Sequence, residues 1–189
     1  MITDNSLASL CRLAYTDTPD IVVADAKVRV FETPGCTVFA FRGTDPDCVA
    51  DWLADIDSDA VEAPGLGSVH RGFYRDALAV WGPLSQRVRG PFVLTGHSKG
   101  AAEAAVVAAL LTLNGKPPAR LTTFGMPRPG TLAGTLDTVP GSDYAHAGDP
   151  VPEVPTWLPH PRKMTVIGSA SIDLLSNHSI NSYISGVTQ

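Results

Sequence analysis

A serine between two glycines is the residue of this 189-residue chain whose setting best suits chemistry. Ser98 stands in Gly96-His97-Ser98-Lys99-Gly100, between a short apolar run at 92–95 and a helix expected at 101–113. This spacing between strand and helix is typical of a nucleophile elbow, a turn so sharp that side chains at positions 96 and 100 would collide with neighbouring elements. We expect the turn to thrust the serine out at its tip. The alternative is a glycine-rich turn with an incidental serine.

A serine nucleophile needs a base, and the base needs an orienting carboxylate. In elbow enzymes the acid and then the histidine follow the serine along the chain. His178 lies after the last expected strand, where a loop can reach over Ser98, so it is the candidate base; the alternative is a helix-start histidine in solvent. Asp149 follows the strand expected at 143–146 in a proline-rich loop and is the candidate acid, with Glu153 as the close competitor.

Acyl transfer also needs hydrogen-bond donors for the oxyanion that forms on the carbonyl oxygen. The backbone N–H of Lys99 opens the helix after Ser98 and points to that position. A second donor is expected from the loop after the strand at 36–41, where Gly43 permits a close backbone approach. An ordinary strand-ending turn is the alternative interpretation of Gly43.

The elements around these residues alternate between helix and strand. Apolar spacing predicts helices at 6–15, 49–56, 70–89, 101–113 and 180–185, and strands at 27–31, 36–41, 92–95, 120–124, 143–146 and 163–167. Gly82-Pro83 should kink or split the third helix, whereas the fourth is apolar nearly all round and must be covered on several sides. This alternation favours an α/β domain with a largely parallel sheet and a site at the carboxyl ends of its strands.

Length and composition predict a single domain over residues 1–189 and exclude several function classes. The chain is 44% hydrophobic and 17% charged, with a net charge of −5 and no run of Lys or Arg that would suggest nucleic acid as a partner. It has no apolar run long enough for a membrane anchor and no basic, apolar leader, so we expect a cytoplasmic protein. The three scattered cysteines favour free thiols over a disulfide framework or a zinc site.

Several blocks in order resemble the class-three lipases, the fungal-lipase-like branch of the α/β-hydrolases. They are Phe39–Thr44, Asp51–Asp55, Val69–Phe73, Thr95–Gly100, Thr123–Gly130, Gly148–Pro152 and His178, and the similarity extends over about residues 28 to 185. The resemblance implies an α/β-hydrolase fold, compact and shortened at its N-terminus, with a mostly parallel central sheet and helices on both faces.

The same resemblance implies roles for individual residues. Ser98 would be the nucleophile, Asp149 and His178 its partners, and Thr44 with the Lys99 amide the oxyanion hole. Residues 45–57 would form a lid, and neither a metal nor an organic cofactor is expected. The family more often has Leu or Gln after the nucleophile, so Lys99 brings a cation near the site that could affect the choice of substrate.

The lid segment is unusual in its charge. It and the residues just after it carry six aspartates, at positions 45, 47, 51, 55, 57 and 59, and only a narrow apolar face. Because a lid that opens onto fat needs a broad apolar surface and anionic membranes repel an acidic one, we expect an esterase for short or medium acyl esters. The alternatives are an interfacial lipase or phospholipase, and a non-catalytic binding protein of the same fold. The segment could also be a solvated acidic face whose stripe packs on the core.

Overall fold

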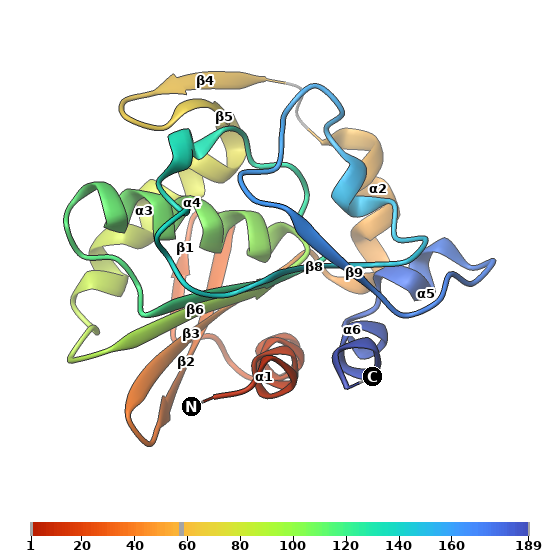
Figure 1. The fold of residues 1–189 in the computed structure, drawn as a ribbon, viewed down its shortest axis with the longest axis horizontal. Helices are drawn as coiled ribbons and strands as arrows, with labels where there is room; N and C mark the ends of the chain where they lie inside the picture. Colours follow the sequence, from red (N-terminus) through yellow and green to blue (C-terminus); the bar gives the residue numbers. More distant parts are fainter. Residues whose placement is uncertain (1, 57–58, 189) are drawn as a thin grey trace.

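A seven-stranded sheet runs through the centre of the protein (Figure 1). The computed structural model describes residues 2–56 and 59–188. The strand order is β1-β2-β3-β6-β7-β8-β9, in which β1 to β3 are antiparallel and β3, β6, β7, β8 and β9 pair in parallel. The strands are β1 (Ile21–Val23), β2 (Ala26–Thr33), β3 (Cys36–Arg42), β6 (Phe92–His97), β7 (Arg120–Phe124), β8 (Asp143–His146) and β9 (Met164–Ile167). The mostly parallel sheet predicted from the sequence is confirmed.

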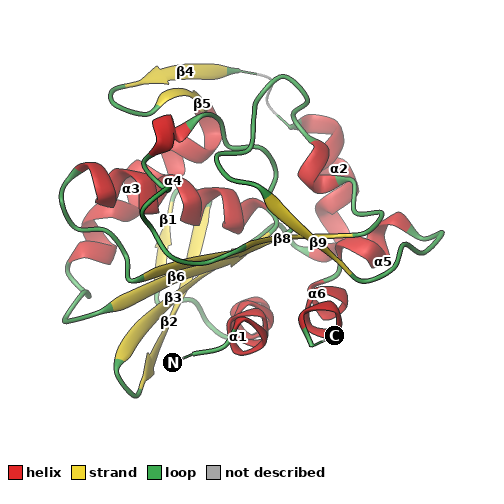
Figure 2. Cartoon of the chain, viewed as in Figure 1, coloured by secondary structure: helices red, strands yellow, loops and turns green. Residues whose placement is uncertain are grey.

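Helices cover both faces of this sheet (Figure 2). On one face lie α3 (Arg71–Ser85) and α4 (Lys99–Leu113), and on the other α1 (Asp4–Thr16) and α6 (Ile180–Val187), which are side by side. Two short α-helices, α2 (Val49–Asp55) and α5 (Leu174–His178), a hairpin of β4 (Ala60–Ala63) and β5 (Gly67–His70), and three 3-10 helices at Pro46–Cys48, Leu132–Gly134 and Val151–Glu153 complete the regular elements of the described chain. The architecture is that of an α/β-hydrolase.

Successive side chains along the central strands point to opposite faces of the sheet, so the hydrophobic core is divided between these two faces. On β3, Val38 faces α1 and α6, whereas Phe39 and Phe41 face α3 and α4. On β6, Val93 and Leu94 divide in the same way. Because parallel strands are buried on both faces, they lack the apolar–polar alternation of an exposed sheet.

Helix α4 is enclosed, as its composition predicts. Every residue from position 100 to 111 is buried. Its alanines let it approach β3 and β6 closely, while α3 covers its outer side. The helix that begins one residue after Ser98 is therefore fixed within the core.

Two local predictions differ from the structure. Gly82-Pro83 does not split α3, because Pro83 falls in the last turn and the helix ends at Ser85. A proline there removes only one hydrogen bond near the helix end. His178 is the last residue of α5 and does not open the terminal helix, whose N-cap is Ser179. Among the described residues, no helix is both long enough and apolar enough to span a bilayer.

Candidate active site

Ser98 occupies a strained turn between β6 and α4. Its backbone has φ 59° and ψ −136°, a conformation that costs a non-glycine residue energy and occurs mainly at functional sites. The turn is held in place by the hydrogen bond from the Ser98 N–H to the carbonyl of Phe124, at 3.0 Å. The strand–turn–helix context expected for an elbow is present.

Three glycines make this turn possible. A Cβ on Gly96 would lie 2.4 Å from the carbonyl oxygen of Gly100, and a Cβ on Gly100 would lie 2.4 Å from that of Phe41. A Cβ on Gly43 would lie 2.8 Å from Ser98 Cβ and 2.6 Å from the carbonyl oxygen of His97. The collisions expected at positions 96 and 100 are therefore confirmed, and the loop after β3 reaches the serine itself.

The serine is not exposed at the tip of the turn, in contrast to the expectation from the sequence. Its relative exposure is 0%. The elbow pattern predicts where the side chain is directed, but the Gly43 loop packs directly on it. A substrate can reach Ser98 only if part of this cover moves.

Asp149 and His178 form a buried pair at the carboxyl end of β8. Asp149 Oδ2 lies 2.8 Å from His178 Nδ1, and both side chains are almost completely enclosed. Asp149 Oδ1 accepts a hydrogen bond from the Val151 N–H at 2.9 Å, which fixes the carboxylate on the loop. The carboxylate orients the imidazole so that Nε2 is free for chemistry.

The competing acid lies elsewhere. Glu153 is exposed, and its carboxylate accepts a hydrogen bond from Arg128 Nη2 at 2.7 Å. Of the other histidines, His70 caps the start of α3 and His160 contacts the carbonyl of Pro152. The geometry therefore brings Asp149, rather than Glu153, to His178.

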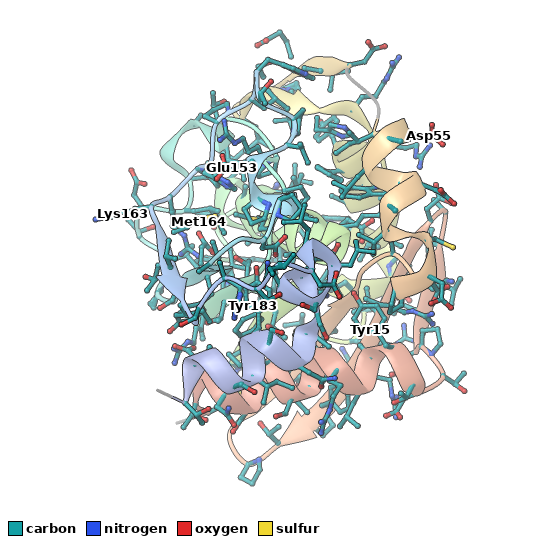
Figure 3. All side chains as sticks on the ribbon, turned by 90° about the vertical axis from the view of Figure 1, so that its right-hand side faces the viewer. Tyr15, Asp55, Glu153, Lys163, Met164 and Tyr183 are labelled. Atoms are coloured by element: carbon teal, nitrogen blue, oxygen red, sulfur yellow. The ribbon has the colours of Figure 1, made fainter. Side chains whose placement is uncertain are left out.

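Two tyrosines contact the residues around this pair, and no local sequence pattern predicts their roles. Tyr183 on α6 donates to Asp149 Oδ2 at 2.5 Å and accepts from the His146 N–H. Tyr15 on α1 contacts His97 Nδ1 at 2.8 Å. Figure 3 shows both tyrosines on the side of their helices that faces the sheet. Their partners are 34 and 82 residues away in the sequence, so no local pattern could reveal them.

His97 links the serine to the histidine. Its ring stacks on that of His178, with centroids 4.7 Å apart, and its Nε2 lies 2.8 Å from the His178 carbonyl oxygen. Burial, reinforced by His178, holds the pKa of His97 well below its ordinary value. A neutral His97 donates from one ring nitrogen and accepts at the other, which suits its two partners.

Two buried polar atoms remain without hydrogen bonds at this place. Within residues 2–56 and 59–188, neither Ser98 Oγ nor His178 Nε2 has a hydrogen-bond partner. His97 connects the two residues, because it precedes Ser98 in the chain and its ring stacks on that of His178. Buried polar atoms are seldom left unpaired, and catalytic groups awaiting substrate are one recognised reason.

Thr44 and Lys99 border the elbow from two sides. Thr44 follows Gly43 in the loop after β3, and Lys99 is the first residue of α4. Both line a cavity of about 480 Å³ that also touches α2 and the start of α3. A larger cavity, of about 1210 Å³, lies at the opposite end of the sheet, against turns that precede β3, β6 and β8, and is remote from these residues.

The segment expected as a lid lies over this cavity. Residues 45–56 are described, and Asp57 is outside the described residues. Val49 and Trp52 of α2 and the following residue, Ile56, turn inward, and Trp52 and Ile56 pack on the main core. The aspartates at 45, 47, 51, 55 and 59 are exposed, and Asp45 and Asp55, the latter labelled in Figure 3, also line the cavity. The segment thus has a solvated acidic outer face and a narrow inner stripe.

Comparisons with known proteins identify similarity to lipases. Residues 38–158 match the family described as lipase (class 3). The secreted mono- and diacylglycerol lipase A of Penicillium cyclopium is 29% identical over 178 residues, which cover 79% of this chain and 57% of the lipase. Toxin TseL of Vibrio cholerae is 34% identical over 117 residues, 56% of this chain and 18% of the toxin.

A solved structure shares the fold. The triacylglyceride lipase of Rhizomucor miehei superposes with a TM-score of 0.63 at 20% identity, over 80% of this chain and 72% of that one. The chain spans 57% or less of the length of the two curated relatives. The identities are low, so the structural match concerns the fold.

Proposed function

The chain belongs to the lipase (class 3) family, and on this premise we propose that it is a serine carboxylic-ester hydrolase that works through an acyl-enzyme. One observation carries the proposal. Ser98 Oγ and His178 Nε2 are buried and unpartnered within the described chain, beside a His178–Asp149 pair 2.8 Å apart. A nucleophile, a base and an orienting carboxylate are the parts that acyl transfer from an ester requires.

The reaction has two halves. Ser98 Oγ attacks the ester carbonyl carbon while His178 Nε2 takes its proton, and the protonated His178 then gives that proton to the departing alcohol. Water enters and attacks the acyl carbon while it loses a proton to His178; His178 then returns that proton to Ser98 Oγ as the ester bond to the serine breaks, and the acyl group leaves as a carboxylic acid. Asp149 holds the imidazole in the correct tautomer throughout and stabilises the imidazolium.

The oxyanion is stabilised by donors from two elements. The backbone N–H of Lys99 comes from the first turn of α4, whose dipole also favours negative charge at this end. Thr44 offers a backbone N–H and a hydroxyl from the loop that Gly43 brings against Ser98. These bonds are strongest in the transition state, and therefore raise turnover more than affinity.

Short or medium acyl esters are the proposed substrates. The outer face of the segment at 45–56 carries exposed aspartates, the chain has a net charge of −5, and the inner stripe of α2 is narrow. Such a surface is repelled by anionic membranes and offers little apolar area to a fat droplet.

A second candidate, a lipase that acts at an interface, is favoured by a different segment. Ile172 is fully exposed, and Leu174 and Leu175 are about half exposed, immediately before His178 in the chain. Large apolar side chains that project together next to a site are typical of lipid-binding surfaces.

A fluorophosphonate probe and a series of 4-nitrophenyl esters test the proposal. Wild type should react with the probe and hydrolyse the esters, Ser98→Ala should do neither, and Ser85→Ala, at the exposed end of α3, should behave as wild type. Hydrolysis should be fastest for short acyl chains, without a jump where the substrate passes its solubility limit. A sharp rise on emulsified long-chain esters would favour the interfacial lipase. A folded wild type that the probe does not label would favour a non-catalytic protein.

A further inference from the structure

Three ionisable side chains are buried together behind the elbow, and the proposed chemistry uses none of them. Lys99 follows the serine directly, Glu103 lies one helical turn later on α4, and Asp76 comes from α3. The Asp76 and Glu103 side chains have no exposed surface, and that of Lys99 is 17% exposed. Burying charged groups is costly unless they are paired, so such a cluster calls for an explanation.

The Lys99 ammonium holds three parts of the protein together. Its Nζ lies 2.7 Å from Glu103 Oε1, 3.0 Å from Asp76 Oδ2 and 3.3 Å from the backbone oxygen of Asp25, in the turn between β1 and β2. Arg75 closes the outer side of the cluster by donating to Asp76 Oδ1 at 2.9 Å and to Asp25 Oδ2 at 2.6 Å. Of the three N–H groups of an ammonium, two have hydrogen-bond acceptors here, in Asp76 and Asp25, whereas Glu103 lies at ion-pair distance and neither of its oxygens has a hydrogen bond within the described chain.

The charges in the cluster balance near neutral pH. Burial raises the pKa of Glu103 to about 8, against the opposing effect of Lys99 and with a further rise from Asp76, so Glu103 is protonated. Burial lowers the pKa of Lys99, but Glu103 and Asp76 raise it by more; burial raises the pKa of Asp76, but Lys99 and Arg75 lower it by more. Lys99 is thus a cation beside the Asp76 carboxylate, while Arg75 pairs with Asp25.

We propose that Lys99 is a positioning residue for the oxyanion hole, which it serves by fixing the first turn of α4 to α3 and to the β1–β2 turn. The proposal rests on the function proposed above. The donor that must point at the oxyanion is the backbone N–H of Lys99 itself, and the side chain of the same residue is anchored on two other elements. Oxyanion donors act through preorganisation, so a small rotation of this turn weakens the bond that forms in the transition state.

This role differs from substrate recognition by a cation. A lysine that bound an anionic substrate would need its ammonium turned toward that substrate, whereas this one donates to Asp76 and Asp25 and lies 2.7 Å from Glu103 Oε1. The Asp76 carboxylate also offsets its charge. Its effect is therefore expected in turnover and not in the Michaelis constant.

Two substitutions at Lys99 test the proposal. Lys99→Met keeps the length and removes the charge, and should lower kcat by about 10- to 100-fold with KM changed less than about twofold, which is below the loss of a whole oxyanion donor. Lys99→Arg, which keeps the charge and can still pair with the Asp76 carboxylate, should stay within about threefold of wild type. Lys116→Met, at an exposed position after α4, is the matched control.

A neutral version of the cluster covers the case in which Lys99→Met does not fold. The triple variant Asp76→Asn/Lys99→Met/Glu103→Gln leaves no unpaired ion, so it should fold, yet it should show the same loss of kcat. Wild-type kcat in a folded Lys99→Met or in the triple variant would overturn the proposal. So would a raised KM for an anionic ester at unchanged kcat, which would make Lys99 a substrate-binding residue. A wild type that the fluorophosphonate probe does not label would overturn the proposed function and this role together, whereas an active wild type with a fully active Lys99→Met would refute this role alone.

The pH profile gives a readout that a merely structural role would not move. Lys99 from α4 and Asp76 from α3 are the charged side chains that act on Glu103. When Glu103 loses its proton above about pH 8, a negative charge appears one turn into the helix whose N-terminus stabilises the oxyanion. We expect kcat to fall there by about three- to tenfold in wild type and to stay level in Glu103→Gln. An identical alkaline fall in both proteins would contradict the proposal.

Discussion

Replacing Asp149 with asparagine tests the site at the point where its geometry is best defined. The two carboxylate oxygens have different partners: Oδ1 accepts from the Val151 N–H at 2.9 Å, whereas Oδ2 accepts from Tyr183 at 2.5 Å and lies 2.8 Å from His178 Nδ1. An aspartate can accept at both oxygens. An asparagine has one acceptor and one donor, so it cannot satisfy both sides at once.

Each orientation of the amide has a defined cost. If the NH2 group faces His178, Nδ1 must accept, the proton moves to Nε2, and the histidine can no longer take a proton from Ser98. If the NH2 group faces Val151, the productive tautomer survives, but two buried N–H groups point at each other, which costs about 1–3 kcal/mol. In both cases the imidazolium loses a charged partner, which is worth about 1.5–3 kcal/mol more.

These costs together predict a fall in kcat of about 10²–10⁴ for Asp149→Asn, in line with the roughly 10⁴ known for the best-studied triad. Glu153→Gln is the matched control. It makes the same chemical change at an exposed residue paired with Arg128, and should leave kcat within about twofold and stability within about 1 kcal/mol. The assay is hydrolysis of 4-nitrophenyl acetate at neutral pH, with thermal melting as the check of folding. A folded Asp149→Asn that keeps more than about a tenth of wild-type kcat, or a reversed ranking of the two variants, would refute the assignment of the acid.

Three further predictions concern the surroundings of the serine. Thr44→Val keeps the backbone N–H and deletes the hydroxyl, so kcat should fall by about 10²–10³ with little change in KM if the hydroxyl is an oxyanion donor. A variant that retains more than about half of wild-type kcat would show that only the backbone amide of residue 44 has that role. Gly43→Ala would place a Cβ 2.4 Å from Tyr15 Oη and 2.8 Å from Ser98 Cβ, so it should lower the free energy of unfolding by about 1–3 kcal/mol and remove much of the activity. The control is Gly82→Ala, in open space on α3, which should raise the free energy of unfolding by about 0.5–1 kcal/mol. Glu103 keeps its proton in the folded protein up to about pH 8 but loses it near its ordinary pKa of 4.5 when unfolded. The folded state of wild type should therefore lose stability relative to Glu103→Gln as the pH rises from 4.5 to about 8, by at most about 5 kcal/mol. Equal melting curves of the two proteins at both ends of this pH range would contradict this prediction.

Local patterns predicted most of the elements that carry the site. The strands β7 and β8 lie at the predicted residues, and β3, β6 and α4 differ only at their ends. Their signals are clear because each contains apolar or aromatic residues in a segment bounded by glycine, proline or polar residues. The placement of Asp149 beyond β8 followed from the same reasoning, since the carboxyl ends of parallel strands share one edge of the sheet.

Elements with weak local signals were not predicted. Strand β1 has three residues, and the hairpin of β4 and β5 has two strands of four residues around a turn at Gly65. Such short strands have too few positions for an apolar–polar alternation to stand out. Their pairing depends on the partner strand, which a local window does not contain.

The burial of Ser98 and the setting of Lys99 could not be predicted for a different reason. The elbow pattern gives the direction of the serine side chain, but its cover comes from the Gly43 loop, 55 positions earlier in the sequence. Likewise, the charge of Lys99 is visible in the sequence, whereas its neutralisation depends on Asp76, which approaches through the packing of α3 on α4. Both are tertiary contacts between segments that are far apart in the chain.

The two residues that flank Ser98 in the elbow are tied to opposite sides of the sheet. His97 is held between Tyr15 on α1 and the His178 carbonyl, on one side of the sheet. Lys99 is held by Asp76 and Glu103 on the other side. A residue between two such anchors has little freedom to relax, which explains how Ser98 keeps a φ of 59° without being a glycine. Strain of this kind persists only where the surroundings over-determine the conformation, and here the determination comes from both layers of helices at once.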